Sequence, residues 1–167
     1  RIILLIHENL GDVGYMGLFG STKTPPLPSS APIDPKWVRN PKGAFYQLKD
    51  LDPDEVGLRS IGGVYVVWHG GVRPKWVFVG ESPSLGRAID AVLDDDEVMQ
   101  YQINGGLFVT WSQVREEFRR GVVLYLTRHL KPVVVNPLAP TEESEHTKPI
   151  AVLVPGGKAA PAGAATK

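Results

Sequence analysis

Two short runs of β-branched and aromatic residues lie close together in the middle of the chain. Residues 64–68 read Val-Tyr-Val-Val-Trp and residues 76–79 read Trp-Val-Phe-Val, with glycines and a proline between them. Residues of this kind favour strands, and glycine with proline favours the turn that joins two strands. The pattern therefore predicts a β-hairpin with a loop, and a hairpin is stable only when further elements pack against it.

The residues after the hairpin are predicted to form a helix, a third strand and a longer helix. Apolar residues recur at helical spacing from about Ser84 onward. Residues 107–111 have the composition of a strand. Ser112 is a good N-cap for the longer helix, which Pro132 stops, and residues 133–135 are expected to run extended.

The order of these elements predicts the fold class. We expect an α/β (α+β) domain over residues 56–137, with a small mixed or antiparallel three-stranded sheet and flanking helices. Residues 1–55 are rich in glycine and proline and are expected to form an extended N-terminal arm, although Asp52 could cap a short helix. Residues 138–167 are expected to form a Pro/Gly/Ala-rich C-terminal tail, in which residues 150–154 could add an edge strand.

Composition excludes several classes of protein. The chain has 167 residues, 43% of them hydrophobic, which is enough for one compact core. Eighteen basic residues balance eighteen acidic ones, so any binding of nucleic acid must be local. No cysteine is present, which excludes disulfides and thiolate zinc sites, and the apolar runs are too short for a membrane span. We expect a soluble protein, cytoplasmic or virion-associated, with no membrane partner and no secretion through disulfide-dependent folding.

The order of several short motifs resembles that of the GIY-YIG nuclease family. Residues 63–65 (Gly-Val-Tyr) are similar to the first half-motif, and residues 78–82 (Phe-Val-Gly-Glu-Ser) are similar to the second. Arg87 follows on the predicted helix, and Asn136 follows the last helix, as a closing asparagine does in the family. The resemblance covers residues 57–137 and implies a small mixed sheet with helices packed on it.

The resemblance also implies roles in phosphodiester hydrolysis. Tyr65 would activate or orient the nucleophilic water, and Arg87 would hold the scissile phosphate. Phe78 stands where a supporting tyrosine belongs and lacks its hydroxyl, and Asn136 would brace the site. The family's cation-binding glutamate has no counterpart, because its position falls near Val123.

Two other carboxylates are candidates for the missing metal ligand. Glu117 lies on the same predicted helix, about 9 Å from Val123 along the axis at 1.5 Å per residue. Glu81 lies inside the second half-motif. The metal ligands are therefore unknown, and we expect no cofactor, with Mg²⁺ or Mn²⁺ required only if the protein is active.

Three functions are compatible with these observations. The first is a GIY-YIG-like domain with impaired or lost nuclease activity that binds nucleic acid or protein partners and is not an enzyme. The second is a structural or assembly protein, a virion or multisubunit-complex component, which holds protein partners, including further copies of itself, through its terminal arms. The third is an active metal-dependent endonuclease with a displaced carboxylate. Contacts to DNA or RNA would come from the following cations: Arg87, Arg115, Arg119, Arg128 and Lys131.

Overall fold

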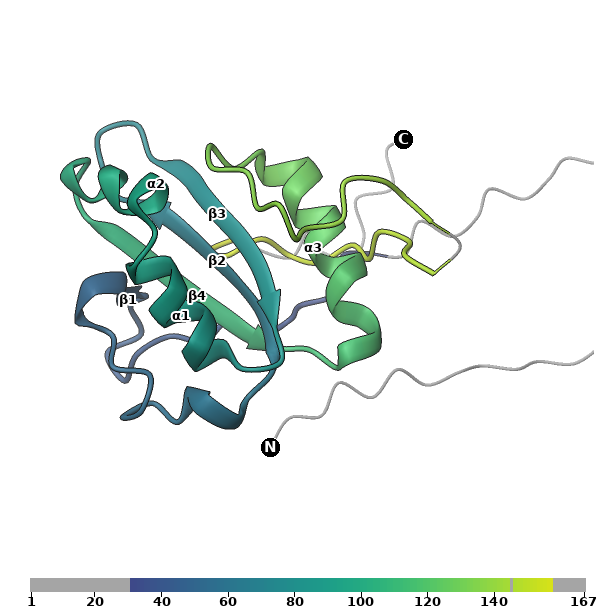
Figure 1. Cartoon of the computed structure of the whole chain (residues 1–167), viewed down its shortest axis with the longest axis horizontal. Helices are drawn as coiled ribbons and strands as arrows, with labels where there is room; N and C mark the ends of the chain where they lie inside the picture. Colours follow the sequence, from purple (N-terminus) through teal and green to yellow (C-terminus); the bar gives the residue numbers. More distant parts are fainter. Residues whose placement is uncertain (1–30, 145, 158–167) are drawn as a thin grey trace, which may run out of the picture. The chain divides into compact units, whose positions relative to one another are not determined.

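An antiparallel sheet forms the centre of the computed structural model, which describes residues 31–144 and 146–157. Its strand order is β1-β4-β2-β3 (Figure 1). The strands are β1 (Tyr46–Gln47), β2 (Gly63–His69), β3 (Lys75–Ser82) and β4 (Leu107–Gln113). The predicted α/β class, hairpin and third strand are confirmed, and β1 adds a two-residue fourth strand to the sheet.

Helices connect and cover these strands. The α-helices are α1 (Leu85–Leu93), α2 (Asp96–Met99) and α3 (Glu116–Leu130). The 3-10 turns are η1 (Leu48–Asp50), η2 (Leu58–Ser60) and η3 (Gln100–Ile103). Within the described part of the chain, none of these helices has the length and apolar character needed to cross a bilayer.

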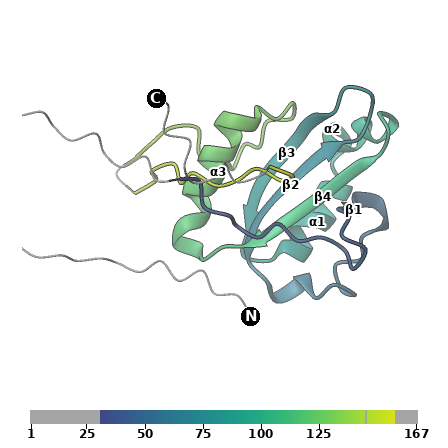
Figure 2. The same cartoon turned by 180° about the vertical axis from the view of Figure 1, so that it is seen from behind.

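The side chains of β2 point alternately to the two faces of the sheet, where they contribute to two separate hydrophobic clusters. Tyr65 and Val67 pack in a cluster to which α1 contributes, and Val64 and Val66 pack in a second cluster with α3. Neighbouring side chains of a strand point to opposite faces. The sheet therefore lies between α1 and α3, and α1, in front of the sheet in Figure 1, lies behind it in Figure 2.

The predicted start of the longer helix is wrong. Ser112 lies in β4, where it pairs with Val64, and its hydroxyl donates a hydrogen bond to the carbonyl of Pro35. Helix α3 begins at Glu116 instead, after Arg115, whose side chain makes no capping hydrogen bond. Sheet pairing and a contact to a residue distant in sequence thus take the serine away from the helix.

The helix predicted from Asp52 is a single turn. Asp52 does act as a cap, because its Oδ1 accepts hydrogen bonds from the N–H groups of Asp54 (2.8 Å) and Glu55 (3.4 Å). Gly57 then adopts the left-handed conformation (φ +73°), which cannot continue an α-helix, and η2 follows. The predicted cap at Asp52 is correct, and the predicted short helix appears as this turn followed by the 3-10 helix η2 rather than as one continuous helix.

Parts of both predicted arms pack on the domain. Within residues 32–55, Leu48 and Leu51 are buried in the cluster on the α1 face. Val152 makes a parallel bridge with Ile33, so residues 150–154 do not join the edge of the sheet as predicted. Residues 1–30 of the predicted N-terminal arm and residues 158–167 of the predicted tail lie outside the described residues.

Gly121 is the point at which the segment 148–154 contacts α3. The N–H of Ile150 donates to the Gly121 carbonyl (3.0 Å), and a Cβ at Gly121 would lie 2.5 Å from the carbonyl oxygen of Lys148. Gly121→Ala favours the helix by about 1 kcal/mol but should detach this segment. We expect the Ile150 amide to exchange its hydrogen roughly tenfold faster or more. Arg120→Ala, at an exposed neighbouring position, is the control, and unchanged exchange in Gly121→Ala would contradict this contact.

Candidate functional site

The two half-motifs meet in the β2–β3 pair. Tyr65 lies opposite Gly80, and Val67 lies opposite Phe78. The Tyr65 ring covers Gly80, because a Cβ there would lie 2.5 Å from the tyrosine hydroxyl oxygen and 2.6 Å from Cζ. The Phe78 ring stacks on the Tyr65 ring with centroids 6.1 Å apart. These residues form one buried packing unit on the face that α1 covers.

The surroundings of Tyr65 make its phenol a poor base. The residue is 6% exposed, and burial raises the pKa of its hydroxyl well above the ordinary range. The negative charges of Glu81 and Asp95 raise this pKa further. Both effects disfavour the charged phenolate, so the hydroxyl stays protonated at neutral pH. In this state it could orient a water molecule but could not remove its proton.

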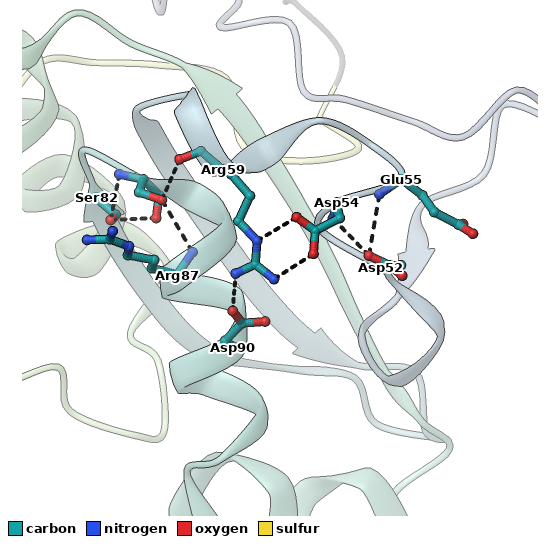
Figure 3. A network of polar contacts seen from close by, with 8 residues as sticks. Asp52, Asp54, Glu55, Arg59, Ser82, Arg87 and Asp90 are labelled. Atoms are coloured by element: carbon teal, nitrogen blue, oxygen red, sulfur yellow. Dashed lines mark hydrogen bonds and ion pairs between the residues drawn. The ribbon is translucent and has the colours of Figure 1, made fainter.

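Arg87 projects from the first turn of α1, where Ser84 is the N-cap. The Ser84 hydroxyl accepts a hydrogen bond from the Arg87 N–H (3.5 Å) and donates one to the Arg59 carbonyl (2.8 Å). Figure 3 shows the Arg87 side chain extending away from the ion pairs of Arg59. Within the described residues, no salt bridge involves Arg87. This cation is therefore available to an anion at the start of the helix.

The Arg59 network fixes the position of α1 and hence of Arg87. The Arg59 guanidinium donates to both carboxylate oxygens of Asp54 (2.9 Å each) and also pairs with Asp90 of α1 (Figure 3). The hydrogen bonds from Arg59 lower the pKa of Asp54 below its ordinary value. Gly86 permits the close approach, because a Cβ there would lie 2.9 Å from Cδ of Arg59. The turn before β2 thus holds the first turn of the helix in place.

The carboxylate candidates do not gather around Tyr65. Glu117 belongs to α3, which packs on the opposite face of the sheet, and it pairs with Arg115 (3.3 Å). Glu81, next to Gly80 in β3, is the candidate whose charge reaches the Tyr65 hydroxyl. In the described residues no group of three His, Asp or Glu side chains could hold a metal ion. The candidate glutamates therefore do not form a preassembled cluster of metal ligands beside Tyr65.

Asn136 braces the outer edge of the sheet. Its Nδ2 donates a hydrogen bond to the carbonyl of Val79 in β3 (3.0 Å). The N–H of Val134 donates to the carbonyl of Val77 (3.0 Å), so the segment after α3 runs along the same strand. The Asn136 Oδ1 also accepts a hydrogen bond from the N–H of Leu138 (3.0 Å), so both ends of the amide bind backbone groups in this structure.

Most of the side chains predicted to contact nucleic acid instead bind other groups of the protein. Arg128 pairs with Glu143 (2.7 Å), and Arg115, just before α3, pairs with Glu117 in the first turn of that helix. The Arg119 guanidinium lies against Gly62, and its Nε donates to a backbone carbonyl (2.8 Å). The cations of the set without a salt bridge to another described residue are Arg87, Arg119 and Lys131. Contacts within the protein therefore reduce the number of these cations that are available to bind phosphate groups.

Sequence reasoning missed a cavity at the other end of the hairpin. About 610 Å³ in volume, it is lined by residues of the β2–β3 loop and of the connection between η3 and β4. His69, the last residue of β2, lines it and is 5% exposed. The available signal was a histidine that ends an apolar strand and is followed by two glycines and two nearby cations, Arg73 and Lys75.

No family model, no curated protein and no solved structure matches this chain. The likeness to the GIY-YIG family accordingly depends on the half-motifs, Arg87 and the order of the elements, and it remains a prediction.

Proposed function

We propose that this chain is a GIY-YIG-like domain with impaired or lost nuclease activity that acts by binding nucleic acid or a protein partner. The burial of Tyr65 carries the proposal. Its ring packs over Gly80, and its hydroxyl is kept protonated by burial and by neighbouring negative charge. A water-activating role would require a buried phenolate beside carboxylates, which is unfavourable in this environment.

The arrangement of the carboxylates supports the same proposal. Mg²⁺ is usually bound by one or two carboxylates, and water and substrate phosphates complete its oxygen ligands. Glu81 is near Tyr65, whereas Glu117 lies across the sheet and is paired with Arg115. We therefore derive no metal-assisted step for this domain.

The position of Arg87 supports nucleic acid, rather than protein, as the partner. Its side chain is exposed at the capped start of α1, where backbone N–H groups and the helix dipole also favour a phosphate. Since the other basic residues are mostly engaged, we expect a small number of phosphate contacts and weak affinity.

Assembly with another protein is a second candidate, favoured by aliphatic side chains that follow α3. Val135 is 77% exposed and Leu138 is 82% exposed, beside the segment that runs along β3. Exposed aliphatic groups close together are typical of a surface that another molecule covers.

The test is incubation of the protein with supercoiled plasmid, single-stranded DNA and RNA, with and without Mg²⁺ or Mn²⁺. We expect no cleavage under any of these conditions. We expect weak binding of a labelled single strand whose affinity falls with salt, with a logarithmic slope smaller by about 0.7 in Arg87→Ala. Arg120→Ala, which changes another exposed cation, is the matched control.

Two results would change this proposal. Metal-dependent cleavage that is lost in Arg87→Ala would overturn it in favour of an active nuclease. Absence of both cleavage and nucleic-acid binding would leave the assembly candidate as the better explanation.

A further inference from the structure

We propose that the cavity at the loop end of the β2–β3 hairpin binds a small organic anion, a carboxylate or phosphate attached to an aromatic or aliphatic group. Its volume of about 610 Å³ is in the range of small-ligand sites. The cavity lies at the His69 end of β2. The start of α1 lies at the other end of this strand, where Gly63 pairs with Ser82. This inference is therefore independent of the proposed function.

Glycines bring the two loops that form the cavity into direct contact. The N–H of Gly70 donates to the carbonyl of Gly106 (3.0 Å). A Cβ on Gly71 would lie 2.6 Å from the carbonyl oxygen of Asn104, and one on Gly105, where φ is +86°, would lie 2.9 Å from Cα of Gly71. Larger residues would force the loops apart, so these glycines preform the walls of the site.

The charge of the lining favours an anion. Arg73 and Lys75 both line the cavity, and both are exposed. No aspartate or glutamate lines it, and neither cation forms a salt bridge with another described residue. In a chain whose basic and acidic residues balance, this is a local excess of positive charge. Arginine and lysine together are well suited to carboxylate or phosphate oxygens.

The mouth of the cavity adds apolar surface. Val72 is 103% exposed and Ile103 is 88% exposed, and both line the cavity, as does Tyr101. Aliphatic side chains this exposed gain free energy when another apolar group covers them. A ligand with an apolar body and an anionic head therefore matches this lining better than an inorganic anion does.

His69 supplies a further polar group. Its Nδ1 is buried and has no hydrogen-bond partner among the described residues, and its ring stacks on that of Tyr101 with a centroid separation of 6.1 Å. An unpaired buried polar atom is unfavourable, and a ligand oxygen would relieve the cost when Nδ1 carries the ring hydrogen and donates it. Nδ1 lies beside the Gly70-Gly71 turn, since a Cβ on Gly71 would be 3.4 Å from it. The unpaired Nδ1 therefore lies beside the wall that this turn forms.

The first experiment is an NMR titration of the ¹⁵N-labelled full chain with phenyl phosphate and with 4-methylbenzoate, which distinguish a phosphate from a carboxylate head. Benzyl alcohol and inorganic phosphate are matched probes that each lack one half of the expected ligand. We expect saturable shifts at the amides of Gly71, Arg73 and Asn104 with at least one of the first two probes. Binding of the matched probes should be roughly tenfold weaker or more.

Variants then test the lining residues. Arg73→Ala with Lys75→Ala should weaken binding about tenfold or more, whereas the same changes at Arg120 and Lys42, two exposed cations elsewhere, should leave it unchanged. His69→Phe keeps an aromatic ring beside Tyr101 but removes Nδ1, so it should raise the melting temperature while weakening binding. A residue that serves packing alone would not produce this combination.

Several results would overturn the inference. They are a lack of saturable shifts with every probe, shifts centred away from these loops, and equal binding of benzyl alcohol and phenyl phosphate. Binding that persists unchanged in the Arg73/Lys75 double variant would overturn it as well.

Discussion

Gly63→Ala is expected to destabilise the protein by about 3 kcal/mol, a large effect for the addition of one methyl group. Gly63 begins the central strand β2 and pairs with Ser82 of β3 and with Gln113 of β4. A Cβ at this position would lie 2.1 Å from the carbonyl oxygen of Ser112. That oxygen belongs to the backbone of a strand in the sheet, so relief would require β4 to move and its pairing with β2 to weaken.

Gly62→Ala is the matched control for this experiment. The nearest atom to a Cβ at Gly62 is Nη2 of Arg119, at 2.2 Å, which is the end of a flexible side chain. The guanidinium can move away, so we expect a loss below about 1 kcal/mol. Urea unfolding of the two variants, compared at equal m-values, measures the difference. Similar losses in both variants would show that the contact between Gly63 and β4 is not the cause.

The hairpin and α1 could be predicted from sequence because local signals determine them. The two β-branched runs favour strands, and α1 follows Ser84, near which the predicted helical spacing begins. The start of α3 could not be predicted in this way. Ser112 and Ser84 are both serines placed before a helical pattern, so local sequence alone makes each of them a candidate N-cap. Its place in β4 depends on pairing with Val64 and on the carbonyl of Pro35, 77 positions away in sequence.

The same distinction applies to the candidate site. The hairpin could be predicted, but the pairing of Tyr65 with Gly80 could not. The register shifts by one residue between Val67 and Trp68, and this irregularity, not the loop, places Gly80 opposite Tyr65. The separation of Glu117 from Tyr65 could not be predicted, because it depends on the face of the sheet on which α3 packs. The burial of His69 likewise depends on contacts between two loops that are distant in sequence.

A strong energetic coupling is expected between Tyr65 and Gly80. Gly80→Ala would place a Cβ 2.5 Å from the Tyr65 hydroxyl oxygen, 2.6 Å from Cζ and 2.8 Å from Cε1, and the ring is buried and cannot move freely. We expect a loss of about 2 kcal/mol from this overpacking. Tyr65→Leu, which removes the ring, should cost about 3 kcal/mol by leaving a cavity.

The double variant distinguishes this contact from two independent losses. With the ring absent, the alanine methyl group has space, so Gly80→Ala should cost less than about 0.5 kcal/mol in the Tyr65→Leu background. Tyr65→Phe is the control, because it removes the hydroxyl and keeps the ring atoms that a Cβ would approach, so most of the loss should persist. Urea unfolding of the single and double variants measures the coupling, and additive losses would contradict it. A coupling of this size would mean that the glycine of the second half-motif accommodates the tyrosine of the first, a packing requirement that holds whether or not the domain cleaves a phosphodiester.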